Sequence, residues 1–180
     1  SNNYCELAMA YNKANNMVIN AVSPPPDTPI DKFRECLEKM KQYKGKYETA
    51  VTLILGDLNL KYIDWNKEII RTPDTIKQQI TPSERTSSEM LLDFVNEELL
   101  VQVVSENTRK GKSLLDIILT SDEDIIYNTT VEKTNSDTDH DIITCDILLK
   151  NTNTLPDSSA RAVEKKLLDK LNFHKAQWDS

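Results

Sequence analysis

The sequence predicts an α/β protein, because segments typical of strands alternate with two segments whose apolar residues recur at helical spacing. The clearest strand is the apolar run VTLILG at residues 51–56, which Asp57 and Asn59 follow at once. The two helices are expected over residues 29–43 and 89–99. The other expected strands are residues 4–11, 17–22, 100–104, 114–120, 125–133 and 142–149.

Turn and cap residues set the boundaries of the first elements. The polar residues 12–16 separate the first two strands, which predicts a hairpin. The prolines at residues 24–26 end the second strand, because proline lacks the N–H group that a strand ladder needs. Thr28 is then expected to cap the first helix, with Pro29 at the first helical position.

The later boundaries follow from similar signals. Residues 71–82 are polar, contain prolines and are expected to form a loop. A hydroxyl from residues 86–88 is expected to cap the second helix. Residues 151–160 have the composition of a linker, and residues 161–180 carry apolar side chains at helical spacing. We therefore expect one domain at residues 1–150, followed by a linker and a small amphipathic helix.

Composition narrows the class of protein. A chain of 180 residues with 38% hydrophobic residues has room for one domain with a modest core. The net charge of −7 argues against a protein that coats nucleic acid, although a local basic patch remains compatible with it. Cys5, Cys36 and Cys145 have no metal-ligand spacing, so we expect reduced thiols in an intracellular protein; the alternative is one disulfide and one free thiol. No apolar run approaches the length of a membrane span, so no membrane partner is expected.

Two acidic positions stand out from this background. Residues two apart in an extended chain point to the same side, so Asp57 and Asn59 could together face a hard metal ion or a phosphate, although GDLN is also an ordinary turn sequence. In the strand LLDIILT, Asp116 shares a face with the apolar Leu114 and Ile118. A buried carboxylate without a partner costs roughly several kcal/mol, so Asp116 needs a donor. The candidate donor is His140 in the segment Thr-Asp-His-Asp.

The strongest basic cluster lies directly before the strand that carries Asp116. Arg109, Lys110 and Lys112 are candidates for nucleic-acid contacts at the rim of the site. The alternative is a lysine-rich hairpin turn around Gly111.

The motifs Gly-Asp-Leu-Asn, Leu-Leu-Asp-Ile-Ile-Leu-Thr and Thr-Asp-His, in this order, resemble the endonuclease/exonuclease/phosphatase superfamily. Within it, the chain is most similar to the apurinic-type endonuclease domain of non-LTR, jockey-like retrotransposons, over about residues 5–179. The resemblance implies a partial four-layer α/β sandwich in which residues 1–150 form the C-terminal portion. Residues 151–180 would then lead toward a downstream reverse transcriptase.

The resemblance also implies an activity. Asp57 and Asn59 would hold the attacking water and a phosphate oxygen, and His140 would contact the phosphate while Asp116 orients it. Asp139 would help to bind Mg²⁺. The implied function is Mg²⁺-dependent DNA nicking, with DNA as the partner and the nucleus as the place of action. A Thr-Arg pair in the family supports a role for Arg109.

Departures from the family pattern leave alternatives open. Val22 and Ser23 stand where relatives carry a Tyr and an Arg near the scissile phosphate, and Thr138 replaces a Ser. A metal-binding Glu and an Asn of the family match nothing in this chain, so activity would require an N-terminal half as partner. The alternatives are a catalytically inactive remnant that only binds DNA or protein, and a phosphatase of the same superfamily.

Overall fold

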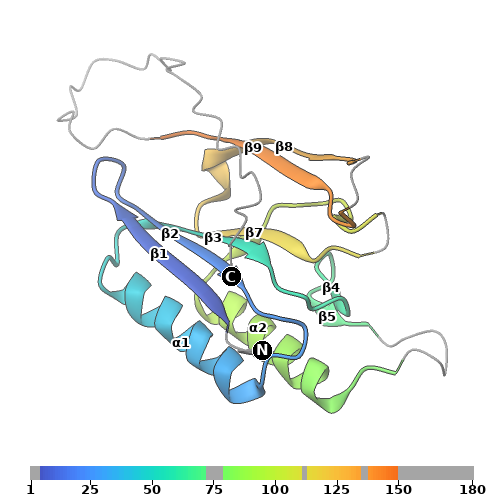
Figure 1. Ribbon diagram of the computed structural model, residues 1–180. Helices are drawn as coiled ribbons and strands as arrows, with labels where there is room; N and C mark the ends of the chain where they lie inside the picture. Colours follow the sequence, from blue (N-terminus) through green and yellow to red (C-terminus); the bar gives the residue numbers. More distant parts are fainter. Residues whose placement is uncertain (1–4, 72–78, 111–112, 135–137, 150–180) are drawn as a thin grey trace.

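The protein is built on a mixed sheet with helices on one face and a second, two-stranded sheet on the other (Figure 1). Among the described residues the main sheet has five strands in the order β1-β2-β3-β7-β6, and β2 runs parallel to β3. These strands are β1 (Glu6–Asn12), β2 (Met17–Ser23), β3 (Val51–Asp57), β6 (Val101–Gln102) and β7 (Asp116–Thr120). The computed structural model describes residues 5–71, 79–110, 113–134 and 138–149.

Helices α1 (Ile30–Gly45) and α2 (Pro82–Glu97) cover one face of the sheet (Figure 1). Their buried side chains, among them Phe33 and Leu91, form one core cluster with Ile54, Ile117 and Leu119 of the sheet. Hydrophobic periodicity predicted the inward side chains of α1, and Leu91, Leu92 and Val95 of α2, correctly. Leu99, which was also expected to face inward, lies beyond the end of α2 and is exposed.

The opposite face is covered by a hairpin of β8 (Ile126–Glu132) and β9 (Ile142–Ile147), preceded by the 3₁₀ turn η1 (Glu123–Ile125). Ile125 and Ile147 pack here against Met17 and Leu53 in a second core cluster. Strand alternation assigns Leu53 to this face and Ile54 to the helical face. The result is the α/β class that the sequence predicts, in three layers.

The first hairpin and the first helix match their predicted positions, but the predicted cap of α1 is wrong. Pro29, not Thr28, is the N-cap, and no side chain caps the helix. The hydroxyl of Thr28 instead donates to the carbonyl of Pro25 at 2.7 Å, which closes the turn that leads into α1. The Thr28 hydroxyl could either cap the helix or close the preceding turn, and in this structure it closes the turn.

The second helix begins before its predicted start. Thr81 caps α2 by accepting from the backbone N–H of Glu84, and the Glu84 carboxylate accepts in return from the Thr81 N–H. This capping box, with Pro82 at the first helical position, lies in the segment that the sequence assigned to a loop. Ser88, a predicted cap, is buried inside the helix and donates to the carbonyl of Glu84.

Two short elements of the fold differ from the prediction, and some predicted segments lie outside the described residues. The small hairpin of β4 (Ile63–Asp64) and β5 (Ile69–Ile70) follows β3, and β6 is shorter than expected. Lys112, most of the predicted loop at 71–82, and the linker and tail helix at 151–180 lie outside the described residues. In the part of the chain that is described, no helix is both long and apolar enough to cross a membrane.

Candidate active site

Two carboxylates meet where β3 ends and β7 begins. Asp57 is the last residue of β3 and Asp116 is the first of β7, and the two are direct partners in the antiparallel pairing. Cross-strand partners project to the same side of a sheet, and strand alternation from Leu53 places Asp57 on the face that the β8–β9 hairpin covers. The register therefore places two acidic groups side by side at one end of the main sheet.

His140 completes this group from the loop that precedes β9. Its Nδ1 lies 2.9 Å from Asp116 Oδ2, and its Nε2 lies 3.7 Å from Asp57 Oδ2. An ionised carboxylate can only accept, so the contact with Asp116 places the proton on Nδ1. Nε2 then faces the carboxylate of Asp57 beyond direct hydrogen-bonding distance.

The Asp57 carboxylate is held in an environment that favours its protonated form. Burial is the main cause that raises the pKa of Asp57, and the nearby charge of Asp116 adds to it. The backbone N–H of Asn59 donates to Asp57 Oδ1 at 2.9 Å and lowers the pKa in part. The outcome is a carboxylate more basic than an ordinary aspartate.

Asn59 lies close to Asp57 but not in the way that strand alternation predicts. β3 ends at Asp57, and Asn59 takes a positive φ of 54° in the following turn. Its side-chain amide donates to the carbonyl of Pro24 at 3.0 Å, which fixes the orientation of the carboxamide. The GDLN sequence therefore forms a turn, and this turn keeps Asn59 beside Asp57.

Gly56 allows β3 to approach β2 at this point. It has a φ of 146°, and a Cβ atom added there would lie 1.8 Å from the carbonyl oxygen of Val22. Val22 itself is buried in the helical-face core, while Ser23 is exposed. Neither residue therefore supplies the Tyr and Arg contacts expected near a scissile phosphate.

Thr108 is a buried anchor whose importance the sequence did not reveal. Its hydroxyl accepts from the backbone N–H groups of Leu115 at 3.1 Å and Asp116 at 3.0 Å. Its carbonyl accepts from the N–H of Asp141 at 2.7 Å. Thr108 therefore joins the start of β7 to the His140 loop, and only its place beside Arg109 in a Thr-Arg pair offered a sequence signal.

The His140 loop has further internal contacts. Lys133 Nζ lies 3.0 Å from Asp141 Oδ2, and the Lys133 ammonium is the first cause that lowers the pKa of Asp141. The hydroxyl of Thr138 accepts from the backbone N–H of His140 at 3.1 Å, so the replacement of Ser by Thr keeps this contact available. These bonds fix the backbone on both sides of the imidazole.

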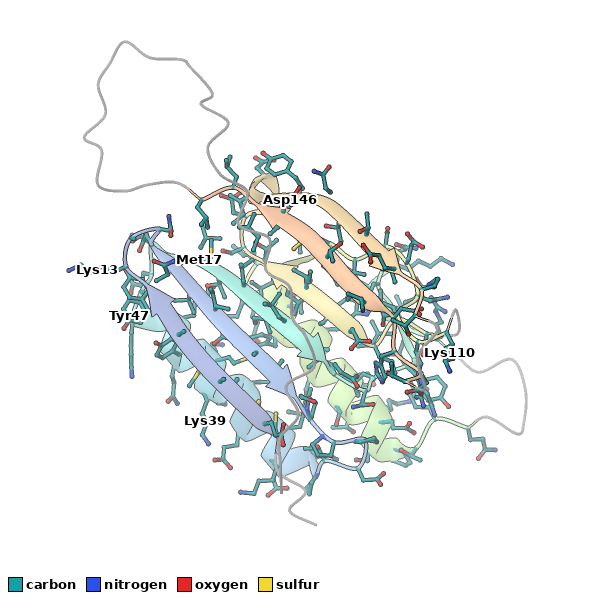
Figure 2. All side chains as sticks on the ribbon, turned by 45° about the horizontal axis from the view of Figure 1, so that its top comes forward. Lys13, Met17, Lys39, Tyr47, Lys110 and Asp146 are labelled. Carbon is teal, nitrogen blue, oxygen red and sulfur yellow. The ribbon has the colours of Figure 1, made fainter. Side chains whose placement is uncertain are left out.

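Asp139 and Arg109 form an ion pair at the exposed rim. Arg109 Nε lies 2.6 Å from Asp139 Oδ2, and the guanidinium is the first cause that lowers the pKa of Asp139. The other oxygen of Asp139 lies 3.7 Å from His140 Nε2. Lys110 lies at this end of the molecule, whereas Lys13 lies at the opposite end (Figure 2).

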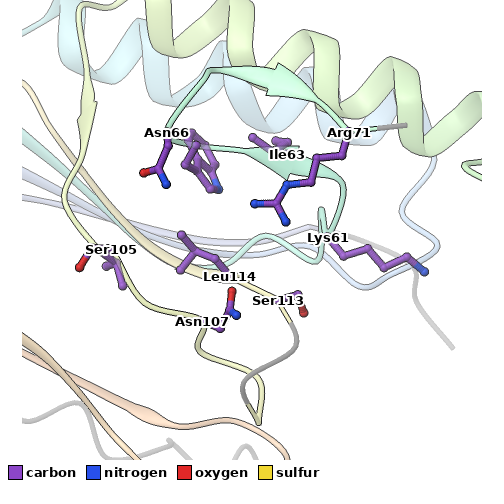
Figure 3. A pocket seen from close by; sticks show the side chains of 10 residues that line it. Lys61, Ile63, Asn66, Arg71, Ser105, Asn107, Ser113 and Leu114 are labelled. Carbon is purple, nitrogen blue, oxygen red and sulfur yellow. The ribbon is translucent and has the colours of Figure 1, made fainter. Parts of the chain in front are cut away.

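A pocket lies between the β4–β5 hairpin and the segment that leads into β7 (Figure 3). Lys61 and Arg71 bring positive charge to it, and Asn107 and Ser113 bring polar groups from the segment around Thr108. Trp65 lines the pocket and packs against the core cluster on the helical face of the sheet.

Three of the candidate residues form a compact set of ligand atoms. One atom each from Asp57, Asp116 and His140 lie within 4.8 Å of one another. Carboxylate oxygens suit a hard cation such as Mg²⁺, and imidazole extends the set to transition metals. Asp139 lies beside the set rather than within it, because Arg109 holds one of its oxygens.

Two comparisons with known proteins both find similarity to endonucleases. A sequence model described as endonuclease-reverse transcriptase matches residues 8–144. The endonuclease domain of TRAS1, a telomere-specific non-LTR retrotransposon, has a similar solved structure, with a TM-score of 0.52 and 18% sequence identity. The similarity covers 81% of this chain and 62% of that one. No curated protein sequence matches.

Proposed function

Because this chain belongs to the endonuclease-reverse transcriptase family, we propose that it is the Mg²⁺-dependent DNA endonuclease domain of a retrotransposon-derived protein. The single observation that carries the proposal is the compact set of Asp57, Asp116 and His140 at the end of the sheet. The proposed reaction is hydrolysis of a phosphodiester bond in DNA, in the nucleus.

Each side chain has a role that its contacts support. Asp116 accepts from Nδ1 of His140 and so fixes the orientation of the imidazole, whose Nε2 would contact the reacting phosphate when it carries a proton. Asp57, whose carboxylate accepts from the backbone N–H of Asn59, would position the attacking water. Asn59 sits on the Asp57 side of the site, held by Pro24, and orients the water and a phosphate oxygen.

The donor set fits a divalent cation. The oxygens of Asp57 and Asp116 would hold Mg²⁺, with Asp139 as an additional ligand. When bound, Mg²⁺ stabilises the negative charge that develops on the phosphate oxygens. The Asp139–Arg109 pair is exposed on both sides, and such pairs contribute little to stability. Asp139 can therefore turn to the cation while Arg109, with Lys110 and Lys112, turns to the DNA backbone.

The proposal includes further protein partners. The chain spans less than two thirds of the TRAS1 endonuclease structure. The family resemblance also implies a metal-binding Glu and an Asn that match nothing in this chain. We therefore propose that an N-terminal half supplies these ligands, and that a reverse transcriptase follows the tail.

Nicking of supercoiled plasmid with Mg²⁺ tests the enzymatic proposal. The chain combined with its proposed N-terminal half should produce open-circular DNA, and His140→Ala, Asp57→Ala or EDTA should abolish the product. His174→Ala and Asp124→Ala are matched controls that should nick normally, because the proposed site uses neither residue. No nicking by the folded, combined protein, or equal nicking by all variants, would overturn the claim that this site cuts DNA.

A second candidate function is a remnant that binds DNA without cutting it. The observation that favours it is the loss of polar contacts at Val22, which is buried in the core, and at Ser23. Retained DNA binding in a mobility-shift assay, without nicking, would identify this case. A phosphatase would instead release phosphate from inositol phosphates or phosphoinositides and leave the plasmid intact.

A further inference from the structure

Two cysteines far apart in the sequence lie together at the edge of the main sheet. Cys5 comes directly before β1, and Cys36 is on the inward face of α1. Their Sγ atoms are 2.7 Å apart, within hydrogen-bonding distance for two sulfur atoms. The third cysteine, Cys145, lies in β9 and packs against the other core cluster, on the opposite face of the sheet.

The two thiols differ in access to solvent. Cys36 is buried, with 4% of its surface exposed, whereas Cys5 is half-buried. The proximity of the Cys36 thiol lowers the pKa of Cys5, with a smaller contribution from Lys39, and burial opposes this. The same contact raises the pKa of Cys36, so Cys5 is the thiol that loses its proton first. An oxidant in solution therefore meets the more reactive sulfur at the surface.

We propose that Cys5 and Cys36 form a reversible intramolecular disulfide, with oxidised glutathione as a sufficient oxidant. The Cys5 thiolate attacks one sulfur of oxidised glutathione and displaces a glutathione thiolate. Cys36 then loses its proton and attacks the Cys5 sulfur of the mixed disulfide, which releases a second glutathione. Two protein thiols are oxidised, and one oxidised glutathione becomes two reduced glutathiones.

The position of the bond gives it a structural effect. It joins the start of the edge strand β1 to α1 across a separation of 31 residues, and closing such a loop restricts the unfolded chain. Glu6, next to Cys5, pairs with Ser23, and the adjacent Pro24 carbonyl holds Asn59. The disulfide therefore anchors the strand end that supports this side of the candidate active site.

Equilibration of the folded chain in buffers of reduced and oxidised glutathione tests the proposal, with acid quenching and alkylation of free thiols. Trypsin should release residues 1–13 linked to residues 35–39, while the peptide of residues 134–150 carries alkylated Cys145. Half-oxidation should need at least about tenfold less oxidised glutathione for folded than for guanidinium-unfolded chain, because folding raises the effective concentration of one thiol near the other. The melting temperature of the oxidised chain should exceed that of the reduced chain.

Three single variants separate this pair from nonspecific oxidation. Cys5→Ser and Cys36→Ser should each remove the linked peptides and the rise in melting temperature. Cys145→Ser should retain both. Three free thiols at every glutathione ratio would overturn the proposal, as would a disulfide to Cys145, a disulfide between chains, or equal oxidation of folded and unfolded protein.

Discussion

Substitution of Thr108 by valine tests whether one buried hydroxyl holds the start of β7, which carries Asp116, in place. Valine has nearly the same shape, so the change removes the acceptor while it keeps the packing. The backbone N–H groups of Leu115 and Asp116 both donate to the Thr108 hydroxyl oxygen, so both lose their acceptor in the valine variant. Thr108 has no exposed surface. A buried donor without a partner costs about 1 to 3 kcal/mol, so two donors cost about 2 to 6 kcal/mol.

Thr108→Ser is the matched control because it keeps the hydroxyl and loses only a methyl group. That loss costs about 1 kcal/mol in a buried site. Urea unfolding monitored by circular dichroism should give a free energy of unfolding that is lower for the valine variant than for the serine variant by at least about 1 kcal/mol. A valine variant as stable as the serine variant would refute the argument that the hydroxyl anchors β7.

Other predictions concern charge and backbone. Asp57→Asn should raise the free energy of unfolding at pH 7, because burial raises the pKa of Asp57 in the folded protein and so makes its ionised form unfavourable there. This gain should vanish as the pH falls below about 4, where the carboxyl is protonated in the folded and the unfolded protein alike. Arg109→Ala should reduce the salt dependence of DNA binding by about one phosphate contact in fluorescence titrations, and Lys13→Ala at the opposite end should not. In thermal melts, Gly56→Ala should destabilise the fold by more than about 2 kcal/mol, because the new Cβ meets a carbonyl of β2. Gly45→Ala is the control: its Cβ enters open space, so the change should be neutral or stabilising by up to about 1 kcal/mol.

The acidic end of β3 and the partner of Asp116 could be predicted from sequence because both depend on local rules. Alternation in β7 separates Asp116 from Ile117, and the cost of burying an unpaired carboxylate requires a donor, which the structure provides in His140. The catalytic roles of these residues remain predictions. Among histidines the choice was narrow, because the only other one in the sequence, His174, lies in the C-terminal tail.

Other features depend on contacts that no local pattern reports. Thr108 is one threonine among many until the fold brings its hydroxyl to β7 and its carbonyl to Asp141. Cys5 and Cys36 have no motif spacing and meet only because α1 packs behind β1. The start of α2 was missed for another reason, since prolines outweighed the capping box formed by Thr81 and Glu84.

The most direct test of the central claim is paramagnetic broadening of the His140 imidazole signals in proton NMR spectra on addition of Mn²⁺. The chain has two histidines, so a His174→Gln variant assigns the spectrum. We predict that substoichiometric Mn²⁺ broadens the His140 signals, that excess Mg²⁺ restores them, and that Asp57→Asn or Asp116→Asn weakens the effect at least about tenfold. Sharp His140 signals at saturating Mn²⁺ in folded protein, or equal broadening in both variants, would contradict a metal site formed by Asp57, Asp116 and His140.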